Sequence, residues 1–143
     1  MRSERVTEVD EALVELFERL VPQLSERAIP PSRAELEAIV ADERTALLVA
    51  RDSDDRIVGT LTLATYRSPT GSTGWIEDVV VDYAARGQGA GEVLTREAMR
   101  LGAEWKLDSI GLTSRPSREA ANRLYRRLGF EERETNVYVW RPL

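Results

Sequence analysis

A glycine-rich turn between a predicted strand and a predicted helix is the part of this sequence best suited to bind a ligand. Residues 79–81 are three consecutive valines, which is typical of a strand covered on both faces. Glycines follow at positions 87, 89 and 91, and apolar side chains then recur at helical spacing from Leu94 to Trp105. The first backbone N–H groups of such a helix lack partners and carry the positive end of the helix dipole. The turn is therefore a candidate site for a phosphate-bearing cofactor.

Two common phosphate-binding motifs do not fit this turn. A dinucleotide fingerprint that starts at Gly87 needs a glycine at position 92, which is Glu92. The chain has no Gly-Lys-Ser/Thr triplet, so a P-loop is excluded. The pattern that does fit is Arg-x-x-Gly-x-Gly, formed by Arg86, Gly89 and Gly91.

Residue composition narrows the possible chemistry. The 143 residues include no cysteine and no histidine, which excludes thiolate and imidazole catalysis and removes the commonest zinc ligands, so we expect no metal. The formal net charge of −5 argues against nucleic acid or an anionic membrane as the main partner. No apolar run approaches the roughly 20 residues of a membrane span. The first residues contain no apolar signal-peptide core, so we expect a cytoplasmic protein.

The order of the predicted elements indicates one α/β domain over residues 1–143. Asp10 is a candidate N-cap of a first helix, which should kink or end at Pro22. Ser32 and Glu35 form a capping box for a second helix. The other predicted elements are strands over residues 4–8, 45–51, 57–66, 75–82 and 109–113, the helix after the glycine turn, a helix over 117–128 and a closing strand over 137–140.

A second motif lies in the last predicted helix, at residues 119–130. This segment, taken together with the glycine turn that precedes it, resembles the GNAT superfamily of N-acetyltransferases, whose helix reads A-x-x-L-Y-x-x-x-G-F. The matching residues are Ala121, Leu124, Tyr125, Gly129 and Phe130. The resemblance extends along nearly the whole chain. It implies a mixed sheet of about six to seven strands flanked by four helices, with two parallel central strands splayed apart.

The resemblance also implies acetyl-CoA as the cofactor, held in the splay between strands 75–82 and 109–113. Backbone groups of Val79, Val80 and Val81 would pair with the pantetheine arm, while the valine side chains pack in the sheet core. Asn122 either bonds the pantetheine amides or is a solvated surface residue. The residues that would surround the pyrophosphate are Arg86, Gly87, Gln88, Gly89, Ala90 and Gly91.

Two residues are candidates for proton transfer. The resemblance makes Tyr125 the general acid, because a proton offered to the departing sulfur of CoA helps it to leave; the alternative is an aromatic residue that only packs. Glu77 is the candidate general base, and the alternative is a chain of water molecules. Strand alternation predicts that Glu77 and its neighbour Asp78 point to opposite faces of the sheet.

The function implied is that of an N-acetyltransferase. Acetyl would pass from acetyl-CoA to a primary amine by direct attack in a ternary complex, since no cysteine is present to form an acyl intermediate. The acceptor is either a small-molecule amine or a protein amine, at an N-terminus or a lysine. The alternative is a non-catalytic module that binds or senses acyl-CoA. A homodimer is a common state in the family, and the sequence gives no independent sign of it.

Overall fold

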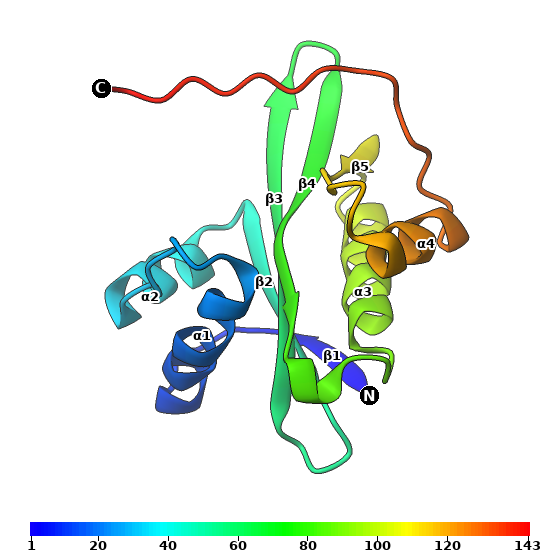
Figure 1. Ribbon diagram of the computed structural model, residues 1–143. Coiled ribbons are helices and arrows are strands. Elements are labelled where there is room, and N and C mark those ends of the chain that lie inside the picture. The colour runs from blue at the N-terminus through cyan, green and yellow to red at the C-terminus, as the bar shows by residue number, and fades with distance from the viewer. The chain divides into compact units, whose positions relative to one another are not determined.

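The computed structural model describes residues 1–143, which divide into two units, Met1–Thr113 and Ser114–Leu143. The second unit contains one helix, α4 (Glu119–Arg127). The elements of the first unit are β1 (Arg2–Arg5), α1 (Glu11–Leu24), α2 (Arg33–Ala41), β2 (Thr45–Arg51), β3 (Ile57–Ser68), β4 (Gly71–Val81), the 3-10 turn η1 (Tyr83–Ala85), α3 (Ala90–Glu104) and β5 (Ser109–Gly111) (Figure 1).

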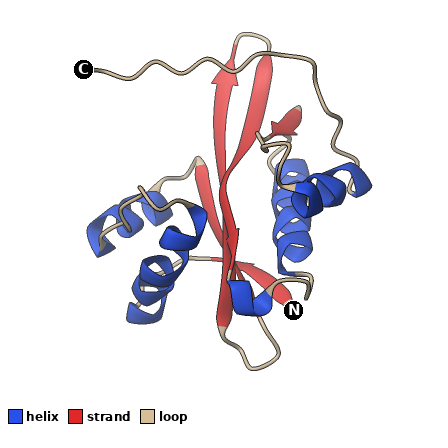
Figure 2. Ribbon diagram, viewed as in Figure 1, coloured by secondary structure: helices blue, strands red, loops and turns tan.

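The five strands form one mixed sheet in the order β1-β2-β3-β4-β5. The first three pairings are antiparallel, and β4 pairs with β5 in parallel. Helices α1 and α2 lie on one face of the sheet and α3 on the other (Figure 2). The main core cluster joins the apolar sides of α1 and α2 to Leu47, Val49 and Val80 of the sheet.

Both predicted helix starts are confirmed. The Asp10 carboxylate accepts the Leu13 N–H at 2.9 Å, and the Ser32 hydroxyl oxygen accepts the Glu35 N–H at 3.1 Å. These contacts satisfy first-turn donors that have no partner within the helix. Helix α1 does not end at Pro22, one of the two predicted outcomes, but continues through it to Leu24.

The sheet has fewer strands than the predicted six to seven, because residues 137–140 form no strand. A strand needs a neighbour to pair its backbone N–H and C=O groups, and these residues pair with none. Their side chains are 65–88% exposed. At the other end of the chain, β1 covers residues 2–5 rather than 4–8. Strands β3 and β4 extend towards each other and shorten the predicted turn between them to Pro69 and Thr70.

Candidate functional site

Strand β4 has a free edge along its second half. It pairs with β5 only where Thr73, Gly74 and Trp75 face Ser109–Gly111. Beyond Trp75 the strand continues to Val81 with no partner on that side. The two parallel strands therefore separate where the sequence predicted a splay, and β4 can accept an extended ligand as an added strand.

A β-bulge lies in the same part of β4. Thr60 of β3 pairs with Val80 and Thr62 pairs with Glu77. Between these two pairs, β4 therefore contains one residue more than β3. Asp78, inside the bulge, has a φ of 51°, which is unusual for a residue other than glycine. The prediction that Glu77 and Asp78 point to opposite faces of the sheet assumed regular alternation of side chains along the strand. The bulge interrupts this alternation at Asp78.

Val79, Val80 and Val81 all lie on this unpartnered stretch of β4. Val80 is 6% exposed and packs in the cluster beneath α1 and α2. Paired residues share a face of the sheet, so Val81, which pairs with Gly59, lies on the opposite face. The Val80 side chain thus packs in the core, whereas no strand pairs with the outer backbone edge of residues 79–81.

Glu77 lies at the start of the free edge, on the face of the sheet that α1 and α2 cover. Its β3 partner Thr62 is two residues from Thr60, which pairs with the buried Val80 of that face. Partial burial raises the pKa of the Glu77 carboxyl, and the negative charge of Asp78 raises it further. A hydrogen bond with the Trp75 side chain acts in the opposite direction but is outweighed. The raised pKa brings the Glu77 carboxyl closer to the range in which it can accept and release a proton near neutral pH.

The glycine turn leads from β4 into α3 and has the backbone that the sequence predicted. Gly87 and Gly89 have φ values of 77° and 88°, a region that side chains disfavour. A Cβ built on either glycine meets no atom within 4 Å, so the turn opens to free space. Gly89 is the N-cap of α3, and no side chain caps that helix start. Ala90 and Gly91 are the first two residues of the helix. The open turn and the uncapped helix start fit the pyrophosphate of a CoA thioester.

Arg86 and Gln88 are placed differently from the glycines. The Arg86 guanidinium lies 3.9 Å from the ring centroid of Tyr83, and its Nε donates to the Val81 carbonyl at 3.4 Å. Gln88 lines a cavity of about 580 Å³ between α1, the β2–β3 turn and the residues before α3. Gln88 is the one predicted site residue that lines this cavity. The three arginines of the cavity are each paired with a carboxylate: Arg19 with Asp82, Arg51 with Glu4 and Arg56 with Asp52.

The second unit holds Tyr125 and Asn122, both on α4. Burial raises the pKa of the Tyr125 phenol, and the positive charge of Arg118 only partly opposes this shift, so the hydroxyl carries its proton at neutral pH. The Tyr125 ring meets the Phe130 ring edge to face, with 5.8 Å between centroids. The Asn122 amide donates to the Arg115 carbonyl at 3.0 Å, which fixes this side chain against the turn before α4.

Sequence reasoning missed three residues that contact the start of the glycine turn. The Asp82 carboxylate accepts a hydrogen bond from Arg19 of α1, and the Gln23 side chain of the same helix accepts the Tyr83 N–H. Asp82 carried a usable signal, because aspartate often caps the turn that follows a strand. Arg19 carried none, since it lies 63 residues away in the sequence.

Two further classes of site find no support in the structure. No group of three or more Asp, Glu, His or Cys side chains is arranged to hold a metal ion. None of the helices combines the length and the apolar character that crossing a membrane requires.

Comparison with known proteins identifies the family. The model of the acetyltransferase (GNAT) family matches residues 10–130. An acetyltransferase structure from Trypanosoma brucei is 28% identical, with 96% of this chain and 97% of that chain covered and a TM-score of 0.74. A structure described as a transcriptional regulator from Bacillus halodurans C-125 is 25% identical, with coverage of 97% and 99% and a TM-score of 0.78.

A third structure shares the fold and contains a CoA conjugate. It is AAC(6')-Iy in complex with the bisubstrate analogue CoA-S-monomethyl-acetylneamine, 18% identical over 100% of both chains, with a TM-score of 0.76. A comparison with curated proteins gives no match. The family model covers most of the sequence, and the chain belongs to the GNAT family of acetyltransferases, whose cofactor is acetyl-CoA.

Proposed function

We propose that this protein is an enzyme that transfers acetyl from acetyl-CoA to a primary amine by direct attack in a ternary complex. The observation that carries the proposal is the free edge of β4, which is followed, after the short 3-10 turn η1, by the open glycine turn at the start of α3. An extended thioester with a pyrophosphate needs both features in this order. The absence of cysteine favours direct transfer over an acyl-enzyme, so the kinetics should be sequential.

The backbone of the first unit would bind the cofactor. N–H and C=O groups of residues 79–81 pair with the amides of the pantetheine arm, and the turn formed by residues 86–91 surrounds the pyrophosphate. An N–H of β4 directed at the thioester carbonyl would stabilise the negative charge that develops there. Such a donor typically contributes about 2.7–4 kcal/mol to the transition state.

Glu77 would act as the general base. A primary amine with a pKa of about 10.4 is almost entirely protonated at neutral pH and must lose a proton before it can attack. The Glu77 carboxylate, with its raised pKa, accepts that proton directly or through a water molecule.

Tyr125 would act as the general acid. Acetyl-CoA supplies the acetyl group as a thioester, and its sulfur leaves more readily when a proton is offered to it. The Tyr125 phenol, which is protonated at neutral pH, is a suitable donor. Asn122 would support the pantetheine arm from the same helix.

We further infer that the acceptor is a small-molecule amine. Two structures that share this fold, both of the same protein, are described as an aminoglycoside acetyltransferase, which supports a compact cationic acceptor over a protein amine. We extend the proposal to a cytoplasmic location, where acetyl-CoA is abundant.

Thermal melting with and without acetyl-CoA tests the cofactor site. A hundredfold excess over the dissociation constant should add about 2.7 kcal/mol of stability to the wild type. Gly89→Glu should abolish the shift, because it places a carboxylate in the turn. Gly89→Ala, which introduces the same backbone strain without the charge, should retain part of it. An unchanged melting temperature of the wild type would refute the proposal.

Release of free CoA thiol in the presence of a panel of primary amines tests the reaction. Turnover with an amine, detected also as a mass increase of one acetyl group on that amine, would support the enzyme. Cofactor binding without turnover on any small amine or lysine peptide would instead favour a module that only binds acyl-CoA.

A further inference from the structure

Asp82, the residue between β4 and the glycine turn, is held by two contacts. One carboxylate oxygen accepts the Arg19 Nε at 2.9 Å, and the other accepts the Ala84 N–H at 3.3 Å. The Asp82 side chain is only 19% exposed. Burial on its own would raise the pKa of this carboxyl, but the Ala84 N–H, Arg19 and Gln23 together lower it. The residue is therefore a stable anion whose position is fixed by its donors.

Helix α1 supplies two further contacts to the same place. Arg19 also donates to the Ile57 carbonyl at 3.1 Å, and Gln23 accepts the Tyr83 N–H at 2.9 Å. Arg19 and Gln23 are four residues apart, so they lie on one side of the helix. The Gln23 amide additionally donates to the Arg19 carbonyl at 3.4 Å.

These contacts continue to the first residue of the glycine turn. Tyr83, whose N–H is held by Gln23, carries the ring on which the Arg86 guanidinium rests. Arg86 is followed directly by Gly87, the first glycine with a positive φ. A continuous set of side-chain contacts thus connects α1 to the turn.

We propose that Arg19, Gln23 and Asp82 are positioning residues for cofactor binding, through which α1 holds the glycine turn in its open form. This inference rests on the proposed function, because it assumes that the turn binds the pyrophosphate of acetyl-CoA. It adds a role for α1, a helix that contributes no residue to the predicted site.

Substitutions of the two partners of the Arg19–Asp82 ion pair should weaken acetyl-CoA binding to different extents. Arg19→Gln leaves the Asp82 carboxylate without its cation. Asp82 is four residues before Arg86 in the sequence, and its unpaired negative charge would repel an anionic ligand in the turn. Asp82→Asn removes the charge but retains an oxygen that can accept the Ala84 N–H. The double variant Arg19→Gln/Asp82→Asn removes the unpaired charge, so it should recover part of the affinity that Arg19→Gln loses.

Isothermal titration of the 143-residue chain with acetyl-CoA tests this inference. Arg19→Gln should weaken acetyl-CoA binding about tenfold. Asp82→Asn and the double variant should each lose less affinity than Arg19→Gln. Gln23→Ala should also weaken binding. At saturating acetyl-CoA, kcat should be unchanged in every variant, which distinguishes positioning from chemistry.

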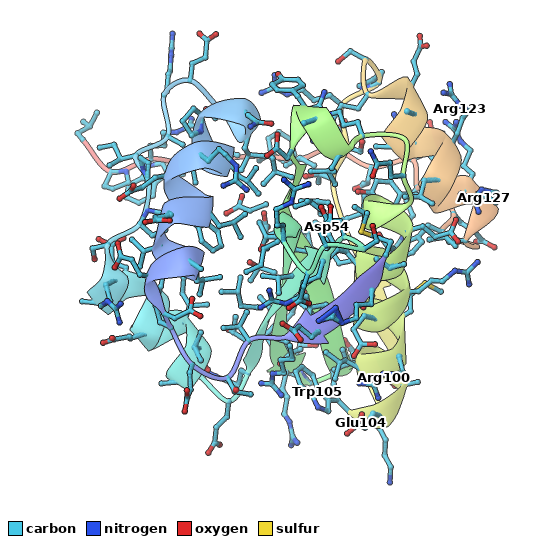
Figure 3. The ribbon with its side chains drawn as sticks, turned by 90° about the horizontal axis from the view of Figure 1, so that it is seen from below. Asp54, Arg100, Glu104, Trp105, Arg123 and Arg127 are labelled. Carbon is cyan, nitrogen blue, oxygen red and sulfur yellow. The ribbon has the colours of Figure 1, made fainter.

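Arg100→Gln is the matched control. It breaks ion pairs with Glu97 and Glu104 in the last turns of α3, at the end of that helix far from the glycine turn (Figure 3). Melting temperatures without ligand establish whether each variant is folded. If Arg19→Gln does not fold, Gln23→Ala still tests the inference. If the wild type binds acetyl-CoA but Arg19→Gln and Gln23→Ala bind as Arg100→Gln does, the inference is wrong and the proposed function stands. If the wild type does not bind, the proposed function itself fails.

Discussion

At the scale of single residues, two neighbours of Glu77 have opposite effects on the pKa of its carboxyl. The Asp78 charge raises the pKa of the Glu77 carboxyl, and the hydrogen bond with Trp75 lowers it. Asp78→Asn should therefore lower the Glu77 pKa, whereas Trp75→Phe should raise it. Because a base must be deprotonated to act, the acidic limb of the activity profile should move to lower pH in the first variant and to higher pH in the second.

Carbon-detected NMR titration of the Glu77 carboxyl measures these shifts without a known acceptor. Trp75→Phe is the appropriate change at that position, because it removes the indole N–H and keeps an aromatic ring. Movement of both variants in the same direction would contradict the arrangement described for Glu77.

Tyr125 permits a test of the chemical step alone. Tyr125→Phe removes the hydroxyl and keeps the ring that packs on Phe130. If the hydroxyl donates the proton to sulfur, kcat should fall by about 10²–10⁴-fold while the melting temperature and the affinity for acetyl-CoA stay close to those of the wild type. A variant with full kcat would reduce Tyr125 to a packing residue.

At the scale of elements, the point where β4 and β5 separate depends on a contact between Trp75 and Gly111. These two residues form the last pair of the parallel strands. A Cβ on Gly111 would lie 2.4 Å from the Trp75 ring, so alanine cannot fit unless the ring or the backbone shifts. Gly111→Ala should lower the free energy of unfolding by about 1–3 kcal/mol, measured by denaturant titration.

The double variant Gly111→Ala/Trp75→Leu provides the control. The smaller side chain makes room for the new methyl group, so the combined loss should be less than the sum of the two single losses. Strict additivity would show that the ring and the glycine do not interact.

Elements whose signals are local could be predicted from the sequence. The N-caps at Asp10 and Ser32 and the strand over residues 45–51 agree with the structure, because each depends on residues within one turn or on an unbroken apolar run. The closing strand over 137–140 could not be predicted in this way. Its alternating valine and aromatic residues are typical of a strand, but a strand exists only where a partner pairs with its backbone.

The same distinction applies to the candidate site. The glycine turn was predictable, because positive φ values restrict the residue type at Gly87 and Gly89. The bulge at Asp78 was not, since it depends on how β4 aligns with β3. The contact of Arg19 with Asp82 likewise depends on the packing of α1 against the sheet.

At the scale of the whole molecule, the core and the proposed chemistry are distributed unequally between the two units. Every buried apolar side chain of the core lies between Leu13 and Leu101, in the first unit. Helix α4 contains no buried residue, although it carries the candidate acid Tyr125. The first unit therefore contains the whole buried core, and the second carries the proposed acid.

A chain that ends at Thr113 tests this division. It keeps the complete sheet, α1 to α3 and the glycine turn, so it should retain cooperative thermal unfolding and a circular dichroism spectrum of mixed α/β type. It lacks Tyr125 and Asn122, so turnover should be lost. Because burial of apolar surface is the main stabilising contribution to folding, a cooperative transition in this shortened chain would locate the stability in the first unit. A chain without such a transition would instead show that residues 114–143 contribute contacts that the fold needs, and the four apolar residues at 137–140 would be the first place to look for them.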